Sequence, residues 1–175
     1  MENIRSKDWY ISSFNRIEES LNGESKTPFH EMRKKAISKF DEIDFPTTRN
    51  EEWKYTNIAP ILKFNFRQVT GMNPSKKDIE KFLIPGLKVN LAVIMNGNYV
   101  PGLSHFYKQP EGVRIESFKD TIANDPALLM KYFGRYAAID NGFTALNTAF
   151  ASDGAVIIIP DDAVINEHIH ILNLS

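Results

Sequence analysis

The 175-residue sequence contains no cysteine. Without a thiol, these residues form no disulfide, supply no cysteine ligand to a metal centre and offer no thiolate nucleophile. The sequence also lacks both glycine-rich phosphate-binding motifs, G-x-x-x-x-G-K-[ST] and G-x-G-x-x-G, and no serine lies in a nucleophile-elbow pattern. These absences remove several common kinds of catalytic and nucleotide-binding chemistry from consideration.

Long apolar runs and an excess of charge are missing as well. No stretch approaches the ~20 apolar residues of a membrane span, and the start, MENIRSKDWYISSF, does not resemble a secretory signal. The charges of the 21 basic and 22 acidic residues nearly cancel. The sequence therefore has no excess of positive charge that would attract nucleic acid or an anionic membrane. We therefore expect a folded cytoplasmic protein with neither nucleic acid nor membrane as partner.

Two amphipathic helices are predicted at the start of the chain. The apolar residues of the first recur at helical spacing, namely Tyr10, Phe14, Ile17 and Leu21. Gly23 is a typical C-terminal stop. The second helix is predicted to begin at Thr27-Pro28, with Thr27 as N-cap. It should end at Asp44-Phe45-Pro46, because proline disfavours the helical conformation in the preceding residue.

The rest of the chain alternates short strands and helices. A hairpin is the clearest signal, because Asn96-Gly97 follows the β-rich run Leu87–Met95. The other predicted elements are a strand over 63–69 with Phe64 and Phe66, a helix from Asn73-Pro74 to Pro85-Gly86, a strand over 112–117, helices over 125–134 and 140–151, and strands over 155–159 and 164–175. The order predicts an α+β fold, with an N-terminal domain over 1–150 and a purely β region over 151–175. Because the pattern stops at Ser175 without a polar tail, we interpret the chain as cut shortly after the β region begins.

One stretch, FPTTRNEEWKYTNI (45–58), concentrates polar and aromatic residues. A carboxyl group of Glu51 or Glu52 against the indole of Trp53 would suit a general acid. Thr48 and Glu51, however, match the S/T-x-x-E capping box of a helix start. Adjacent glutamates also point about 100° apart on a helix and cannot act together. Architecture is the favoured interpretation, with Trp53 anchoring the segment.

The pair His168 and His170 is the main metal candidate. Residues two apart on a strand share a face, so both imidazoles could reach one ion. Two ligands define no coordination geometry, and the alternative is a pair of surface histidines on an edge strand. His30 and His105 are isolated and are predicted to be surface or cap residues.

Two segments together resemble one family. FPTTRNEEWKYTNI (45–58) resembles the signature near the N-terminus of the SufD proteins, and more distantly of SufB, which are scaffolds of iron–sulfur cluster assembly. FTALNTAFASDGAVIIIPDDAVINEHIHILNLS (143–175) resembles the segment where these proteins enter a right-handed parallel β-helix. The lack of cysteine is more similar to SufD than to SufB. His168 departs from the family, where a proline is frequent at this place.

The resemblance implies a non-catalytic scaffold subunit of the SufBCD complex. Residues 151–175 would be the start of the β-helix core, which pairs with SufB, while a C-terminal helical domain docks the ATPase SufC. The family's cluster site lies beyond Ser175, so the resemblance carries no catalytic, cofactor-binding or metal residue onto this chain, and the cluster belongs to the full complex. The matching positions have a structural role, namely Glu51, Glu52, Trp53, Tyr55 and Asn147.

Two alternatives to this function remain at this point, a small metal-dependent enzyme using His168 and His170, and a generic protein-interaction adaptor. The β region adds an expectation of its own, because one rung of a β-helix needs stacked neighbours. An open edge is a template for pairing with another chain. We expect self-association or partial disorder there, because four isoleucines would be under-covered, namely Ile157, Ile159, Ile169 and Ile171.

Overall fold

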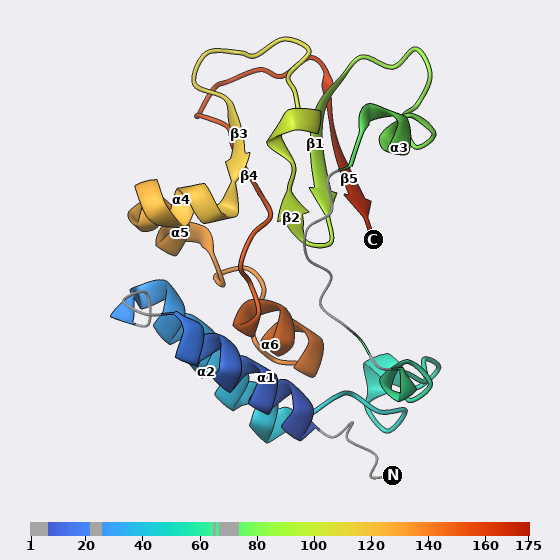
Figure 1. Cartoon of the computed structure of the whole chain (residues 1–175), viewed down its shortest axis with the longest axis vertical. Helices are drawn as coiled ribbons and strands as arrows, with labels where there is room; N and C mark the ends of the chain where they lie inside the picture. Colours follow the sequence, from blue (N-terminus) through green and yellow to red (C-terminus); the bar gives the residue numbers. More distant parts are fainter. Residues whose placement is uncertain (1–6, 22–25, 65, 67–73) are drawn as a thin grey trace. The chain divides into compact units, whose positions relative to one another are not determined.

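The computed structural model describes residues 7–21, 26–64, 66 and 74–175 (Figure 1). The chain divides into two compact units, each built from two separate stretches of sequence. Residues 1–67 and 127–151 form what we call the helical unit, and residues 68–126 and 152–175 form the sheet unit. The mixed composition confirms the predicted α+β class. The predicted domain boundary at residue 150 stays a prediction.

The helical unit contains four α-helices and two short 3-10 helices among its described residues. In chain order they are α1 (Lys7–Ser20), α2 (Pro28–Ile43), η2 (Glu51–Trp53), η3 (Ile61–Lys63), α5 (Pro126–Tyr132) and α6 (Gly142–Ala149). The predicted start of α2 is confirmed, since the Thr27 hydroxyl accepts a hydrogen bond from the His30 N–H at 3.2 Å. The predicted stop of α1 at Gly23 lies outside the described residues.

The core of the helical unit forms where α2 contacts both α1 and α6 (Figure 1). Its buried residues are Phe14, Ala36, Ile37, Phe40, Phe45, Ile58, Ala145 and Ala149. Phe40 packs edge-on against Tyr10 and Phe45, with ring centroids 5.9 and 5.0 Å apart. The buried Arg33 of α2 donates from Nε to the Ala149 carbonyl at 2.8 Å, which fixes the end of α6.

The sheet unit is built around one buried strand. Its elements are α3 (Lys76–Glu80), β1 (Val89–Met95), β2 (Asn98–Tyr99), η4 (Pro101–Leu103), β3 (Arg114–Ser117), α4 (Phe118–Asn124), β4 (Ala155–Ile158) and β5 (His168–Leu174). One sheet has the order β2-β1-β5 and a second pairs β3 with β4 antiparallel. The predicted hairpin is confirmed, because Asn96 and Gly97 have positive φ between the antiparallel β1 and β2.

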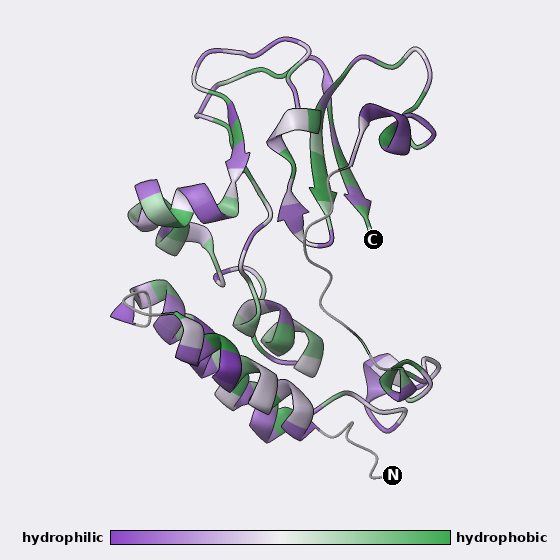
Figure 2. Ribbon diagram, viewed as in Figure 1, coloured by the Kyte–Doolittle hydropathy of each residue, from purple (hydrophilic) through white to green (hydrophobic). Residues whose placement is uncertain are grey.

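β5 lies parallel to β1 along its whole length, from the Val89–His168 pair to the Met95–Leu174 pair. β1 is mostly hydrophobic and buried, whereas α1 and α2 carry both hydrophilic and hydrophobic residues (Figure 2). The buried core of the sheet unit comprises Ile79, Leu91, Val93, Leu103 and Leu172.

Several predicted elements need correction. The strand over 63–69 is wrong in its described part, because Lys63 ends a 3-10 helix, and Phe64 and Phe66 are 68% and 53% exposed. The cap predicted at Asn73 lies outside the described residues. α3 instead has Ser75 as its N-cap, in a capping box with Asp78, and is shorter than predicted. The helix α4 was not predicted at all. Among the described residues, no helix is long and apolar enough to cross a bilayer.

Candidate functional site

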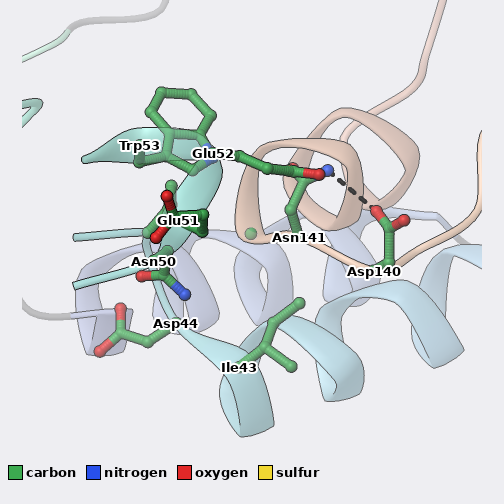
Figure 3. Close-up of a pocket in the computed structure, with 10 residues that line it drawn as sticks. Ile43, Asp44, Asn50, Glu51, Glu52, Trp53, Asp140 and Asn141 are labelled. Carbon is green, nitrogen blue, oxygen red and sulfur yellow. Dashed lines mark hydrogen bonds between the residues drawn. The ribbon is translucent and has the colours of Figure 1, made fainter. Parts of the chain in front are cut away.

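The sequence motif at 45–58 borders a pocket of about 430 Å³ in the helical unit (Figure 3). The lining comes from the end of α2, the segment around η2, and the residues that begin α6. The lining residues are Ile43, Asp44, Pro46, Asn50, Glu51, Glu52, Trp53, Asp140, Asn141 and Gly142. The pocket therefore brings together residues from both stretches of the helical unit, 43–53 and 140–142, which lie about ninety residues apart in the sequence.

The side of the pocket next to α2 is formed by a sharp exit from that helix. The Asp44 N–H still donates to the Phe40 carbonyl at 2.8 Å, but Asp44 itself has φ 58°. Its carboxylate accepts from the Phe45 N–H at 2.7 Å. The positive φ, which aspartate tolerates through such local hydrogen bonds, turns the chain away. The predicted end of α2 is thereby confirmed.

The predicted capping box at Thr48–Glu51 is wrong. The Asn50 side-chain oxygen accepts from the Thr47 N–H at 2.8 Å, and the Thr47 hydroxyl accepts from the Arg49 N–H at 3.3 Å. These side chains satisfy the backbone in a turn, which competes with helix formation. Only one 3-10 turn follows, over Glu51–Trp53, with no side-chain cap.

The opposite side of the pocket depends on a close backbone approach. A Cβ atom on Gly142 would lie 2.2 Å from the Asp44 carbonyl oxygen and 3.0 Å from its carbonyl carbon. Asn141 caps α6, since its side-chain oxygen accepts from the Thr144 N–H at 3.0 Å, and its amide donates to Asp140 at 3.0 Å (Figure 3). A residue without a side chain at 142 is what allows the start of α6 to touch the end of α2.

The pocket lining is acidic, and its carboxylates lie apart from one another. Asp44, Glu51, Glu52 and Asp140 contribute four carboxylates, and no lysine or arginine is among the lining residues described. The general-acid alternative needs a carboxyl group buried against the indole of Trp53, whereas the Glu51 side chain is 90% exposed, with Lys54 Nζ 3.9 Å away. The labelled carboxylates do not converge on one point (Figure 3).

The other residues that match the family differ in their surroundings. Trp53 packs against the core and against Phe143, with ring centroids 5.3 Å apart, as the anchoring interpretation expects. Tyr55 is 92% exposed, and Lys54 Nζ lies 5.7 Å from its ring centroid. Asn147 is exposed on α6. Tyr55 and Asn147 do not line the pocket.

Comparison with known proteins gives this motif its context. The family model described as "SufBD protein N-terminal region" matches residues 4–171, which is nearly the whole chain. The chain belongs to the SufBD N-terminal family. It is also 27% identical over 143 residues to an iron–sulfur cluster assembly SufBD family protein of Synechocystis sp.. That match covers 82% of this chain and 32% of the relative, so the chain spans about a third of the relative's length.

The two candidate metal ligands of this SufBD chain lie on β5. His168 and His170 pair with Val89 and Leu91 of β1, so they share a face of the sheet. Leu172 and Leu174, which pack on the core, occupy the same face. His170 is accordingly half-buried rather than a surface residue, while His168 is exposed. Within the described residues, no group of three or more His, Cys, Asp or Glu side chains is placed to hold a metal ion.

His30 corrects a further expectation. It was predicted at the surface or in a cap, and it does follow the cap of α2, but it is only 2% exposed. Its ring stacks parallel to Phe14 at 6.0 Å, and Nε2 lies 3.3 Å from Glu18 Oε1. This hydrogen bond, aided by Lys34, lowers the pKa of the Glu18 carboxyl. The contact therefore contributes stability above the ordinary carboxyl pKa and loses it as the pH falls through the lowered value. His105 is exposed, as predicted.

Sequence reasoning missed the role of Asp153, which stands in the D-G pair of the second family segment. Its carboxylate accepts hydrogen bonds from the Tyr99 N–H at 3.0 Å, the Ser117 hydroxyl at 2.9 Å and the Lys119 N–H at 3.2 Å. One side chain thus joins β2, β3 and the first turn of α4 to the residues before β4. The sequence signal for this role is the D-G pair itself, because aspartate readily accepts hydrogen bonds from nearby backbone N–H groups.

We expect Asp153→Ala to lower the free energy of unfolding by about 2 kcal/mol, because three donors lose a charged acceptor. Amide hydrogen exchange of β1 in the sheet unit is the suitable measurement, and urea unfolding followed by circular dichroism supports it. Asp153→Asn, which keeps one acceptor oxygen, should be intermediate, and alanine at the exposed Asp161 provides the control. Equal protection in Asp153→Ala and Asp161→Ala would contradict this role.

Proposed function

We propose that this chain is part of a SufD-like, non-catalytic scaffold subunit that works with SufB and SufC in iron–sulfur cluster assembly in the cytoplasm. The observation that carries the proposal is the family match over residues 4–171, together with a motif in which Trp53 packs on the core and Asn50 accepts a hydrogen bond within a turn. The absence of cysteine fits a SufD-like rather than a thiolate-bearing subunit.

We also propose that β5 leads into a parallel β-helix. β5 already lies parallel to β1, and no strand pairs with its other edge among the described residues. Ile171 of β5 is 49% exposed, and Ile159, just after β4, is 48% exposed. A further parallel strand would cover such an edge. In the 175-residue chain by itself, we expect a strand of a second copy to take the place of that further strand at the edge of β5.

Co-purification tests the scaffold function. SufB and SufC from one organism are co-expressed with a tagged form of either the 175-residue chain or the corresponding full-length SufBD protein. We expect the full-length protein to retain both partners and the 175-residue chain to lose SufC, whose docking site belongs to the C-terminal domain that the resemblance implies. Gel filtration of the 175-residue chain alone should show a concentration-dependent dimer.

Two results would count against the proposal. A full-length protein that retains neither SufB nor SufC rejects the scaffold function. A 175-residue chain that holds SufC at full occupancy places the ATPase interface within these residues instead. Retained stoichiometric metal that disappears in a His168→Ala, His170→Ala double variant would favour the metal-dependent enzyme.

A further inference from the structure

A second pocket, of about 260 Å³, lies in the sheet unit, and we call it the Lys88 groove. One wall is the turn that follows α3, and the other is the segment around His105, whose backbone exchanges two hydrogen bonds with Leu91 of β1. The residues that line it are Leu83, Ile84, Leu87, Lys88, Val89, Leu91, His105 and Tyr107.

The Lys88 groove is apolar in its depth and at its opening. Leu91, at its base, is 1% exposed and belongs to the core of the sheet unit. Around the opening, however, Ile84, Leu87 and Tyr107 are 60%, 40% and 43% exposed. Single exposed apolar residues are common on protein surfaces, but several around one cavity mark an interaction site.

The charge at this opening has one sign. Lys88 Nζ lies 5.0 Å from the Tyr107 ring centroid, and hydrogen bonding to Tyr107 raises the pKa of Lys88. None of the described lining residues is acidic. A second lysine, Lys81, lies just before the groove with its Nζ 4.9 Å from the Phe82 ring centroid.

Two acidic groups interact with these lysines, Asp78 with Lys81 and Glu167 with Lys88. Asp78 of α3 accepts from both the N–H and the hydroxyl of Ser75 at 2.7 Å, and the Lys81 ammonium contributes to lowering its pKa. Glu167 attracts the Lys88 ammonium and also favours its charged form. Among the described residues that line the groove, Lys88 carries the positive charge that a partner would meet, and no lining residue is acidic.

We propose that the Lys88 groove binds an acidic segment of a partner protein, which places an apolar side chain against Leu91 and a carboxylate on Lys88. Charge complementarity decides the partner class, because a basic segment would be repelled by Lys88. The apolar base distinguishes the groove from a phosphate site, which would use cations without an apolar anchor. No residue of β5 is among the described residues that line the groove, although Val89 and Leu91 pair with β5.

Peptide titration of the isotope-labelled 175-residue chain tests the proposal. The probe is the end-blocked hexapeptide Glu-Glu-Leu-Phe-Glu-Glu at up to roughly 1 mM, and its counterpart has lysine for every glutamate. We expect the acidic peptide to shift the amide resonances of Leu87, Lys88 and Leu91, and the basic peptide to leave them in place. Lys88→Glu should lower the affinity for the acidic peptide by about tenfold, since an attraction becomes a repulsion. The same variant should bind the basic peptide.

The control variant is Lys119→Glu, which changes the net charge equally at an exposed residue that does not line the groove. It should bind the acidic peptide as the parent chain does. If Lys88→Glu fails to fold, Lys88→Gln is used in its place, which removes the charge without reversing it. This variant should bind the acidic peptide more weakly than the parent chain does, and should not bind the basic peptide. The proposal is overturned if neither peptide shifts these resonances, if both bind equally, or if Lys88→Glu and Lys119→Glu have the same effect.

Discussion

Replacing Phe40 by alanine is expected to lower the free energy of unfolding by about 3–5 kcal/mol, the usual cost of truncating a buried phenylalanine. Phe40 is fully buried on α2 and touches Tyr10 of α1 and the Phe45 ring. Removing the ring leaves a cavity between rigid neighbours and breaks two edge-on aromatic pairs, each of which adds to the burial term. Because folded domains are only marginally stable, most of the helical unit's stability would be lost.

The measurement of this loss can be confined to the helical unit. Both tryptophans of the chain, Trp9 and Trp53, belong to that unit, so urea unfolding followed by their fluorescence reports on it. Phe64→Ala removes the same ring from a residue that is 68% exposed, and should change the stability by less than about 0.5 kcal/mol. A midpoint for Phe40→Ala that coincides with that of Phe64→Ala would mean that the core lies elsewhere.

Local chemistry explains which elements could be predicted from the sequence. Thr27 and Pro28 fix the start of α2, and Asn96-Gly97 fixes the hairpin. In each case the groups that interact lie within about four residues of one another in the sequence. The missed helix α4 also had such a signal, because the Ser117 hydroxyl accepts from the Asp120 N–H at 3.2 Å. The capping box predicted at Thr48–Glu51 does not form, because the Thr47 N–H donates to the Asn50 side-chain oxygen instead. Several local solutions compete for the same polar residues, and the sequence alone does not rank them.

Long-range features were beyond such reasoning. The alternation of β5 was predictable, but its pairing with β1, seventy-nine positions earlier, decides which face is covered. Leu172 is thereby buried and Ile171 exposed, although both are strongly apolar. His30 follows a correctly predicted cap and is still buried, because α1 lies against that face of α2. In the pocket, the acidic residues within 44–53 are evident from the sequence. That residues 140–142 complete the lining depends on tertiary contact, which the sequence does not show.

Gly142→Ala is the sharpest test of that contact. Helix propensity alone predicts that alanine would stabilise the first turn of α6 by up to about 1 kcal/mol. The structure predicts the opposite sign, because the added methyl group would lie 2.2 Å from the Asp44 carbonyl oxygen and 3.3 Å from the Phe45 Cα atom. These obstacles are backbone atoms, so no side-chain rotation relieves the overlap. We expect a loss of about 3 kcal/mol, at the upper end of overpacking costs.

Thermal unfolding followed by circular dichroism should show this loss as a melting temperature lower by roughly 6–12 °C for a chain of this size. Gly102→Ala is the matched control, because a Cβ atom there meets nothing within 4 Å among the described residues. Its melting temperature should stay within about 2 °C of the parent chain. If Gly142→Ala melted at or above the parent temperature, the end of α2 and the start of α6 would not touch, and the pocket beside the family motif would lose its second wall. A lower melting temperature for Gly142→Ala alone would show that the glycine serves close packing, and that the motif's neighbourhood is held by backbone contact.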